Sequence, residues 1–381
     1  MKELSRKVKD IKPSGIRKFF DLANTMEGVI SLGVGEPDFN TPWHICENAI
    51  YSMSQGKTHY TANRGLLELK FHKTRYNQNY DPETETLVTV GGSEAIDIAF
   101  RALLNPGDEV IMLDPNYVAY APAVELADGK CVMIQLKEEN DFKLLPEDLK
   151  NAITDKTKAL MINFPSNPTG GVMTYEDYEK LVPIIKESGI YVISDEIYAE
   201  LSFDQEFASL AQFEEIRDQV IVINGFSKAF AMTGWRLGYV LSNKEISAQM
   251  TKIHQYIIMS APTAAQYAGL EALRNGIDDV LVMKNDYLNR RNLLVNRLNR
   301  MGLKTNMPHG TFYVFPNIQI TGLSSDEFCE KLLEEEKVAC VPGTAFGESG
   351  EGFIRISYAY SLDHIKEACD RIEHFISSRI K

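Results

Sequence analysis

Between residues 86 and 241, short apolar runs alternate with amphipathic stretches, and this alternation constrains the fold more than any other feature of the sequence. Most of the apolar runs are β-branched and lack polar alternation, as in strands that are covered on both faces. The runs are 86–90, 109–113, 130–135, 158–163, 190–194, 219–223 and 237–241. Helical periodicity marks 94–104, 118–126 and 175–187, and Pro183 predicts a kink or break in the last of these. The pattern predicts an α/β fold with a mostly parallel, seven-stranded sheet sandwiched by helices.

Beyond residue 241 the pattern changes to helices and short strands. We expect helices at 244–258, in a stretch that ends at 274, and at 278–301, then strands at 312–315, 338–341 and 353–357 and helices at 325–336 and 361–379. This composition predicts a second, smaller α+β domain. A polar arm precedes the sheet, with a turn at 12–15, a helix-like stretch at 16–25 and a Gly/Pro-rich loop at 33–39. The predicted division is 1–40 for the arm, 41–278 for the large domain and 279–381 for the small domain.

Composition excludes several classes of function. The 381 residues carry a formal net charge of -13, which argues against a nucleic-acid-binding surface. No apolar run approaches the roughly 20 residues that span a bilayer, and the N-terminus lacks the apolar core of a signal peptide. Five cysteines without a CxxC spacing are typical of a reduced, cytoplasmic protein, and seven histidines without ligand-like spacing predict no metal site.

In an open α/β sheet, ligands bind at the carboxyl ends of the strands, so the residues that follow each apolar run are the candidate site. Gly92, Ser93 and Glu94 follow the first run and open a helix, whose free N–H groups and dipole favour an anion such as phosphate. The turn is a weak signal by itself and is not GxGxxG, which argues against a nicotinamide-dependent dehydrogenase. Tyr117 follows the second run, where it either stacks on a flat ligand or fills a loop core.

The later strand ends add polar and charged groups. Asn167 lies in the loop FPSNPTG (164–170), which two X-Pro steps hold tightly. Asp195 comes at the end of a buried run, where a carboxylate needs a positively charged partner. A metal ion is the other candidate partner, but no histidine ligand accompanies it. Lys228 follows the run 219–223, where it is either a solvated loop lysine or a Schiff-base nucleophile. Arg236 lies eight residues beyond Lys228. Arg355 interrupts an apolar strand, and its guanidinium suits either a two-pronged contact to a carboxylate ligand or an internal salt bridge.

One ligand uses all of these groups: pyridoxal 5'-phosphate (PLP), which has a phosphate, a flat ring, a pyridinium nitrogen, a phenolic oxygen and an aldehyde. The chain resembles, over essentially its whole length, the class I aminotransferases of PLP fold type I. The resemblance rests on SNPTG (166–170), SDEIY (194–198), SK through GWRLG (227–238) and GFIRIS (352–357) in this order and spacing. The loop GEPDF (35–39) resembles the bacterial and archaeal branch of aspartate, aromatic and N-acetyl-diaminopimelate aminotransferases.

The resemblance implies roles for the residues around the cofactor ring. Lys228 would form the Schiff base with the cofactor and then carry the proton between the substrate α-carbon and the cofactor. Asp195 would pair with the pyridinium nitrogen and keep it protonated. Asn167 and Tyr198 would donate hydrogen bonds to the phenolic oxygen, and Tyr117 would stack on the ring.

The resemblance also implies the contacts to the phosphate and the substrate. The backbone of Gly92, Ser93 and Glu94, together with Arg236, would hold the phosphate, and Tyr60 would reach the phosphate of a neighbouring subunit in a homodimer. Arg355 would bind the substrate α-carboxylate, the backbone of Gly35 would close over it, and Asn167 and Tyr117 would also contact the substrate.

One position departs from the resemblance. Many relatives carry a phosphate-binding serine three residues before the lysine, and here that residue is Gly225. Either the contact is missing or another group, such as Ser227, replaces it.

The sequence therefore predicts an aminotransferase that moves the amino group of an L-amino acid to a 2-oxo acid, expected to be 2-oxoglutarate, by a ping-pong mechanism. A PLP-dependent carbon–sulfur β-lyase is the alternative of the same fold. A PLP-binding transcription regulator is the alternative of another class, but the fold leaves no room for a DNA-binding domain. The donor stays open among aspartate, aromatic and acylated amino acids, because the expected pocket at 11–16, 33–39 and 311–313 holds no dedicated second arginine for a dicarboxylate.

Overall fold

The computed structural model describes residues 2–11, 26–66, 79–377 and 379. The turn expected at 12–15 and the helix-like stretch at 16–25 lie outside the described residues, as does most of the pocket wall expected at 11–16. Within the described part, no helix is both long enough and apolar enough to cross a membrane.

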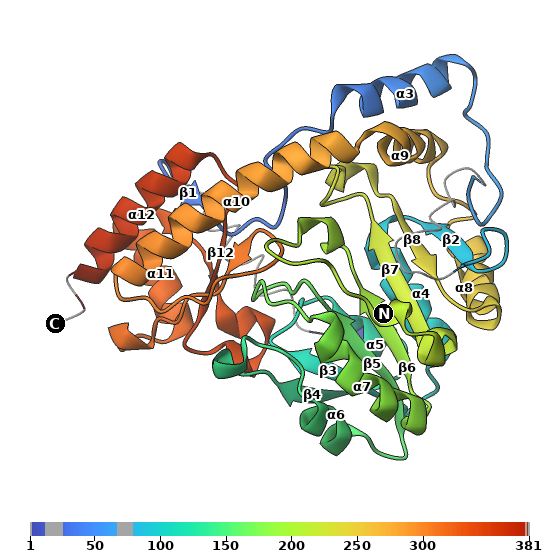
Figure 1. The fold of residues 1–381 in the computed structure, drawn as a ribbon, viewed down its shortest axis with the longest axis horizontal. Coiled ribbons are helices and arrows are strands. Elements are labelled where there is room, and N and C mark those ends of the chain that lie inside the picture. Colours follow the sequence, from blue (N-terminus) through green and yellow to red (C-terminus); the bar gives the residue numbers. More distant parts are fainter. Residues whose placement is uncertain (1, 12–25, 67–78, 378, 380–381) are drawn as a thin grey trace.

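The predicted seven-stranded sheet is present and forms the middle layer of the larger part of the molecule, on the right in Figure 1. Its spatial order is β2-β8-β7-β6-β5-β3-β4, and only β8 runs antiparallel to its neighbours. The strands are β2 (Thr86–Thr89), β3 (Glu109–Asp114), β4 (Lys130–Gln135), β5 (Thr157–Asn163), β6 (Tyr191–Asp195), β7 (Val220–Gly225) and β8 (Gly238–Leu241). The mostly parallel α/β fold is thus confirmed.

The central strands are mostly apolar because helices cover both faces of the sheet. Successive side chains of a strand point to opposite faces, and in β3 Val110 and Met112 join one apolar cluster whereas Ile111 and Leu113 join another. The first cluster includes α4 (Gly91–Leu103), α5 (Tyr120–Leu126) and α8 (Lys244–Ile257). The second includes α6 (Pro146–Ala152) and α7 (Tyr175–Ser188). Alternate residues of β3 therefore contribute to two different cores.

Of the kink or break expected at Pro183, the break is not found, because α7 runs through this residue without interruption. Pro183 lies on the exposed side of the helix, and Glu179, whose carbonyl loses its helical partner, is exposed as well. Water can therefore satisfy that carbonyl. A capping box between Thr174 and Asp177 starts the helix, and Gly189 in the left-handed conformation ends it.

The order of the strands sets the position of the ligand site. Strand β3 lies between β4 and β5, so the chain crosses from one side of β3 to the other after β4. Such a reversal opens a crevice at the carboxyl ends of the neighbouring strands. The loops after β3, β5, β6 and β7 face this crevice.

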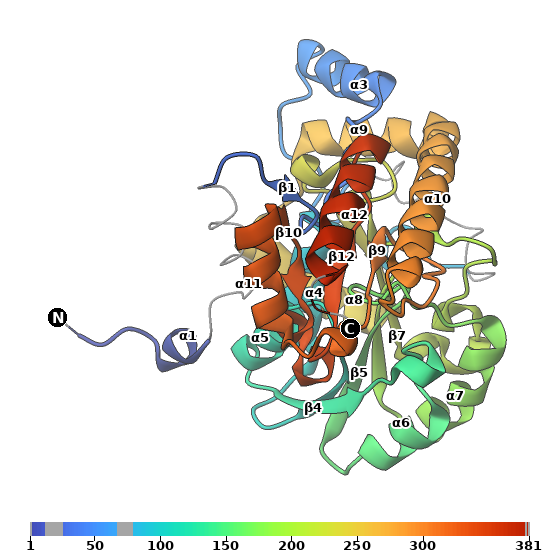
Figure 2. The same cartoon turned by 90° about the vertical axis from the view of Figure 1, so that its left-hand side faces the viewer.

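The remaining chain builds the smaller α+β part, in which α11 (Ser325–Glu336), α12 (Leu362–Ser377) and the long α10 (Ile277–Arg300) lie side by side (Figure 2). Helix α10 extends from α9 (Thr263–Asn275), near the large sheet, to this smaller part (Figure 1). A three-stranded sheet has the order β11 (Val341–Pro342), β12 (Ile354–Ser357), β9 (Tyr313–Val314). In the described part of the chain before the large sheet, α1 spans Arg6–Asp10 and α3 spans Trp43–Ser54.

The strand expected at 338–341 is two strands that belong to different sheets. Strand β10 (Val338–Ala339) pairs in parallel with β1 (Ile30–Ser31), whereas β11 pairs antiparallel with β12. Cys340 lies between the two pairings and is itself buried. Hydropathy cannot separate the two strands, because all of these residues are apolar and buried. The pairing of β1 with β10 joins the segment before residue 40 to the smaller part of the chain.

Candidate active site

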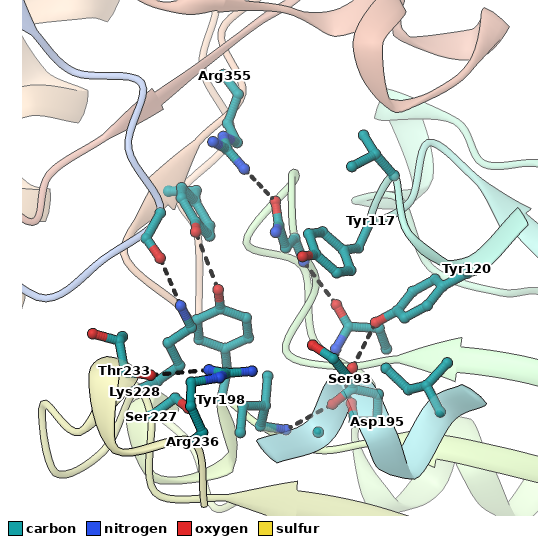
Figure 3. Close-up of a pocket in the computed structure, with 18 residues that line it drawn as sticks. Ser93, Tyr117, Tyr120, Asp195, Tyr198, Ser227, Lys228, Thr233, Arg236 and Arg355 are labelled. Atoms are coloured by element: carbon teal, nitrogen blue, oxygen red, sulfur yellow. Dashed lines mark hydrogen bonds between the residues drawn. The ribbon is translucent and has the colours of Figure 1, made fainter. Parts of the chain in front are cut away.

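A cavity of about 480 Å³ lies at the carboxyl ends of the parallel strands (Figure 3). Most of the residues that the sequence suggested line it: Gly35, Gly92, Ser93, Tyr117, Asn167, Asp195, Tyr198, Lys228, Arg236 and Arg355. Figure 3 shows Lys228, Tyr198 and Arg236 on one side, Tyr117 and Tyr120 on the other, and Arg355 at the far end from Asp195. Two of the suggested residues, Glu94 and Tyr60, do not line it.

Lys228 extends into the cavity from the turn that follows β7. Its Nζ donates a hydrogen bond to the carbonyl oxygen of Gly35 at 2.6 Å. Burial lowers the pKa of the Lys228 amine to about 8, the charge of Glu36 opposes this shift, and the charge of Arg355 adds to it. A depressed pKa gives the amine a neutral fraction near pH 7, which both a nucleophile and a proton acceptor require.

Asp195 is the last residue of β6, and its carboxylate is buried beneath the cavity. Oδ2 accepts a hydrogen bond from the Tyr120 hydroxyl at 2.7 Å, and Oδ1 accepts one from the Ile197 N–H at 3.2 Å. Burial raises the pKa of Asp195 to about 6, and the hydrogen bond from Tyr120 acts in the opposite direction. A positive group beside this carboxylate would stabilise its ionised form. Sequence reasoning missed Tyr120, which lies in an amphipathic helix and has the pattern of a core residue.

Arg355 is a buried cation in the middle of β12, with 2% of its surface exposed. Its Nη1 donates to Asn167 Oδ1 at 2.8 Å and its Nη2 donates to the carbonyl oxygen of Gly33 at 2.6 Å. Its Nε is buried without a partner, and no carboxylate of the described residues forms an ion pair with it. The internal salt bridge that the sequence left open is therefore not found in the described part of the chain. The guanidinium is available to an anion that enters the cavity.

The two asparagines beside Arg355 connect it to the floor of the cavity. The N–H of Asn167 donates to Asn163 Oδ1 at 3.0 Å, and Asn163 Nδ2 donates to the carbonyl oxygen of Asp195 at 2.8 Å. Both asparagines are buried, so these bonds fix the direction of the Asn163 amide and the backbone of Asn167, while the Asn167 side-chain oxygen accepts from Arg355. Sequence reasoning missed Asn163, because it ends an apolar strand and carries no motif that distinguishes it from a turn residue.

Tyr198 forms the wall beside Lys228. Its hydroxyl lies 3.1 Å from that of Tyr313, both side chains are buried, and burial raises the pKa of both hydroxyls above the ordinary value. Gly35 packs against this pair so closely that a Cβ would lie 2.2 Å from Tyr313 Oη. Only glycine fits there without displacing the tyrosine.

The turn before α4 has the features of an anion site. Gly91 has a φ of 73°, and a Cβ there would lie 2.8 Å from Arg236 Nη2, so the guanidinium packs directly on the turn. Arg236 Nη1 donates to the carbonyl oxygen of Thr233 at 2.9 Å. The Glu94 carboxylate faces away from the cavity: it accepts a hydrogen bond from the Val90 N–H at 2.5 Å and contacts His254 Nδ1 at 2.7 Å. N–H groups at the start of the helix and a guanidinium thus border the same space.

The departure at Gly225 has a steric cause. A Cβ at this position would lie 2.9 Å from the carbonyl oxygen of Leu237 and 3.1 Å from Ile197 Cδ1, so a serine would not fit without movement of the backbone. Ser227, the suggested replacement for the contact missing at Gly225, lines the cavity. Tyr60 is 79% exposed and lies outside the cavity, so its role depends on a second chain and stays a prediction.

Comparison with known proteins agrees with this site. The model of the family "Aminotransferase class I and II" matches residues 27–372, and the chain belongs to this family. The chain is 51% identical to YugH of Bacillus subtilis over 98% of each chain, and 45% identical to an aspartate aminotransferase of Pyrococcus abyssi over 97% of each. The crystal structure of an aromatic aminotransferase from Pyrococcus horikoshii superimposes with a TM-score of 0.91 at 43% identity, over 96% of this chain and 99% of that one.

Proposed function

We propose that the chain is a PLP-dependent aminotransferase that moves the amino group of an L-amino acid to a 2-oxo acid, with 2-oxoglutarate as the expected acceptor. The observation that carries the proposal is the pairing, in one cavity, of a lysine whose pKa is about 8 with a buried arginine that lacks a carboxylate partner in the described residues. The amine suits the proton transfer, and the arginine suits the α-carboxylate that every amino-acid donor carries.

The residues of the cavity fit the cofactor. The turn of Gly92 and Ser93 with Arg236 would hold the phosphate, with the backbone of Glu94 as a further candidate, and Asp195 would face the ring nitrogen. Tyr117 would stack on the ring, and Asn167 and Tyr198 would contact its phenolic oxygen. When bound, PLP supplies an aldehyde for the amines and an electron-withdrawing ring that stabilises negative charge at the substrate α-carbon.

The side chains of this protein bind and orient the substrate and move its proton. Arg355 would bind the α-carboxylate through both prongs of its guanidinium, with Nε as a third donor. Lys228 Nζ would take the proton from the α-carbon and deliver it on the cofactor side. With a pKa of about 8, roughly 9% of the amine is neutral at pH 7, against roughly 0.03% for an unperturbed lysine.

We further propose that the functional unit is a homodimer in which the partner subunit's Tyr60 reaches the phosphate. Exposed apolar residues support this proposal: Trp43, Ile50 and Tyr51 lie on α3, and Tyr256 and Ile257 lie at the end of α8. Large apolar side chains gathered on a surface are typical of an interface. The division at residues 40 and 278 is proposed as well, and the second boundary falls where α10 begins.

The test is a donor panel with purified protein, PLP and 2-oxoglutarate, in which glutamate formation is measured with aspartate, phenylalanine, tyrosine and N-acetyl-LL-diaminopimelate. Glutamate formation from at least one donor supports the proposal. Lys228→Ala should lose the visible absorbance of the bound cofactor on a gentle wash and should not turn over amino acids, and turnover by this variant would overturn the role of the lysine. Pyruvate formation from cystathionine without any 2-oxo acid would identify a β-lyase instead.

A further inference from the structure

We propose that Arg290, on α10, is a positioning residue for substrate binding: through its ion pair with Asp38 it sets how the 33–39 loop lies over the cavity. This inference rests on the proposed function, because it assigns the loop a part in binding the amino acid. Arg290 itself does not line the cavity.

The Arg290 guanidinium holds two carboxylates at once. Nη1 lies 2.7 Å from Asp38 Oδ1, on the loop, and Nη2 lies 2.7 Å from Asp286 Oδ2, one turn earlier on α10. The Arg290 side chain is only 6% exposed, and its guanidinium carbon lies 5.1 Å from the centre of the Phe39 ring and 5.5 Å from that of Tyr287. A planar fork clamped between two rings and two carboxylates has little freedom to move.

The loop that Arg290 holds carries the acceptors of the two cations that the substrate needs. The carbonyl oxygen of Gly35 accepts from Lys228 Nζ, and that of Gly33 accepts from Arg355 Nη2, each at 2.6 Å. Asp38 is three residues from Gly35, a span of at most about 11 Å of backbone. Since Pro37 stiffens this span, a shift at Asp38 reaches the carbonyl of Gly35.

A second contact of the loop explains why Arg290 is the informative position. The Glu36 carboxylate accepts a hydrogen bond from the Thr233 hydroxyl, which anchors the loop to the side of the large sheet. Glu36 also acts on the pKa of Lys228, so a change at Glu36 would mix loop position with amine charge. The pair of Asp38 and Arg290 anchors the loop to α10, and neither residue is among the largest causes of the Lys228 pKa shift.

The chain offers a matched control, since Asp38 and Asp286 contact the same guanidinium at the same distance. Their side chains are 26% and 36% exposed, and either substitution by asparagine removes one negative charge. Only Asp38 belongs to the loop. In each single variant the other carboxylate still compensates the buried Arg290, which protects the fold from an unpaired charge.

The experiment measures KM for the amino donor, kcat, cofactor affinity and the thermal midpoint for PLP-loaded wild type, Asp38→Asn, Asp286→Asn and Arg290→Lys. We expect Asp38→Asn to raise KM about fivefold, the size of a partly exposed ion pair, with kcat and cofactor affinity within about twofold. Asp286→Asn should leave KM within about twofold of wild type, and Arg290→Lys, which keeps the charge but not the fork, should give an intermediate KM.

Two outcomes would overturn the inference. One is an equal change of KM in Asp38→Asn and Asp286→Asn, which would mean that the carboxylates act only by compensating Arg290. The other is an unchanged KM in Asp38→Asn. If Asp38→Asn does not fold, KM for the amino donor is compared between Arg290→Lys and Asp286→Asn. A KM raised only in Arg290→Lys supports the inference, and an equal KM in the two variants overturns it. A wild type without any aminotransferase activity would instead contradict the proposed function, so the two failures are distinguishable.

Discussion

The Lys228 amine should titrate near pH 8 in the cofactor-free enzyme, and this prediction can be tested without any turnover. Burial is the largest cause of the shift from 10.5. The shift multiplies the neutral fraction at pH 7 about 300-fold, from roughly 0.03% to roughly 9%. Unfolded chains bind more protons than folded ones between about pH 8 and 10.5, so this group makes the cofactor-free fold more stable as pH rises through that window, by about 3 kcal/mol at most.

The assay is competitive labelling of the cofactor-free enzyme with trace acetic anhydride from pH 6 to 11. Mass spectrometry of the peptide that contains Lys228 gives its labelling at each pH, and Lys180, whose side chain is 63% exposed, serves as the reference within the same sample. Only the neutral amine reacts, so the labelling curve follows deprotonation directly. We expect a midpoint near pH 8 for Lys228.

Two charge variants test the causes of the shift. Glu36→Gln removes a charge that raises the pKa of Lys228, so the midpoint should fall further, whereas Arg355→Gln removes a charge that lowers it, so the midpoint should rise. Neither variant should restore the ordinary lysine pKa of 10.5, because burial is the largest cause of the shift. A wild-type midpoint above 10, or a shift of both variants in the same direction, would refute the reasoning.

Three further predictions concern other residues of the proposed site. Arg355→Lys should raise KM for amino donors at least tenfold and leave cofactor affinity within about twofold, because a lysine cannot bind a carboxylate with two prongs. Steady-state kinetics measures KM and equilibrium dialysis measures cofactor affinity. An equal loss of substrate and cofactor affinity would assign Arg355 to the cofactor. Tyr60→Phe should weaken cofactor retention in the dimer, and unchanged retention would count against a shared site. Tyr120→Phe removes a hydrogen bond that lowers the pKa of Asp195, so the acid limb of cofactor binding should move to higher pH; a limb that stays in place would contradict this.

The large sheet was predictable because most of its strands are buried on both faces and are therefore mostly apolar. Hydropathy then has only to locate the ends of these strands. The rule that ligands bind at the carboxyl ends of parallel strands placed Asn167, Asp195 and Lys228 in one site. Each of these residues is polar where an apolar run stops, which is a signal that a single sequence carries. Arg355 stood out for the same reason, as a charge inside an apolar strand.

The residues that sequence reasoning missed lack such a contrast. Tyr120 lies in an amphipathic helix, where a tyrosine normally fills the core, and only the fold reveals that its hydroxyl meets Asp195. The pairing partners of β10 and β11 depend on long-range contacts that leave no period in the sequence. The crowding around Gly225 arises from the backbone at Leu237 and Gly238 and from the side chain of Ile197. These residues are distant from Gly225 in the sequence, and nothing in the sequence marks them as its neighbours.

The 33–39 loop orders the free site, and its contact with Arg355 would compete with the proposed substrate carboxylate. Lys228 donates to Gly35 and Arg355 donates to Gly33, so both cations are satisfied by backbone carbonyls before any substrate arrives. In the proposed site a substrate carboxylate would compete with the carbonyl of Gly33 for Arg355 Nη2, whereas the Lys228 amine can accept a proton on its lone pair while it donates to Gly35. Substrate affinity is therefore a difference between two sets of hydrogen bonds. Because α10 anchors the loop through Asp38, residues outside the cavity take part in setting that difference.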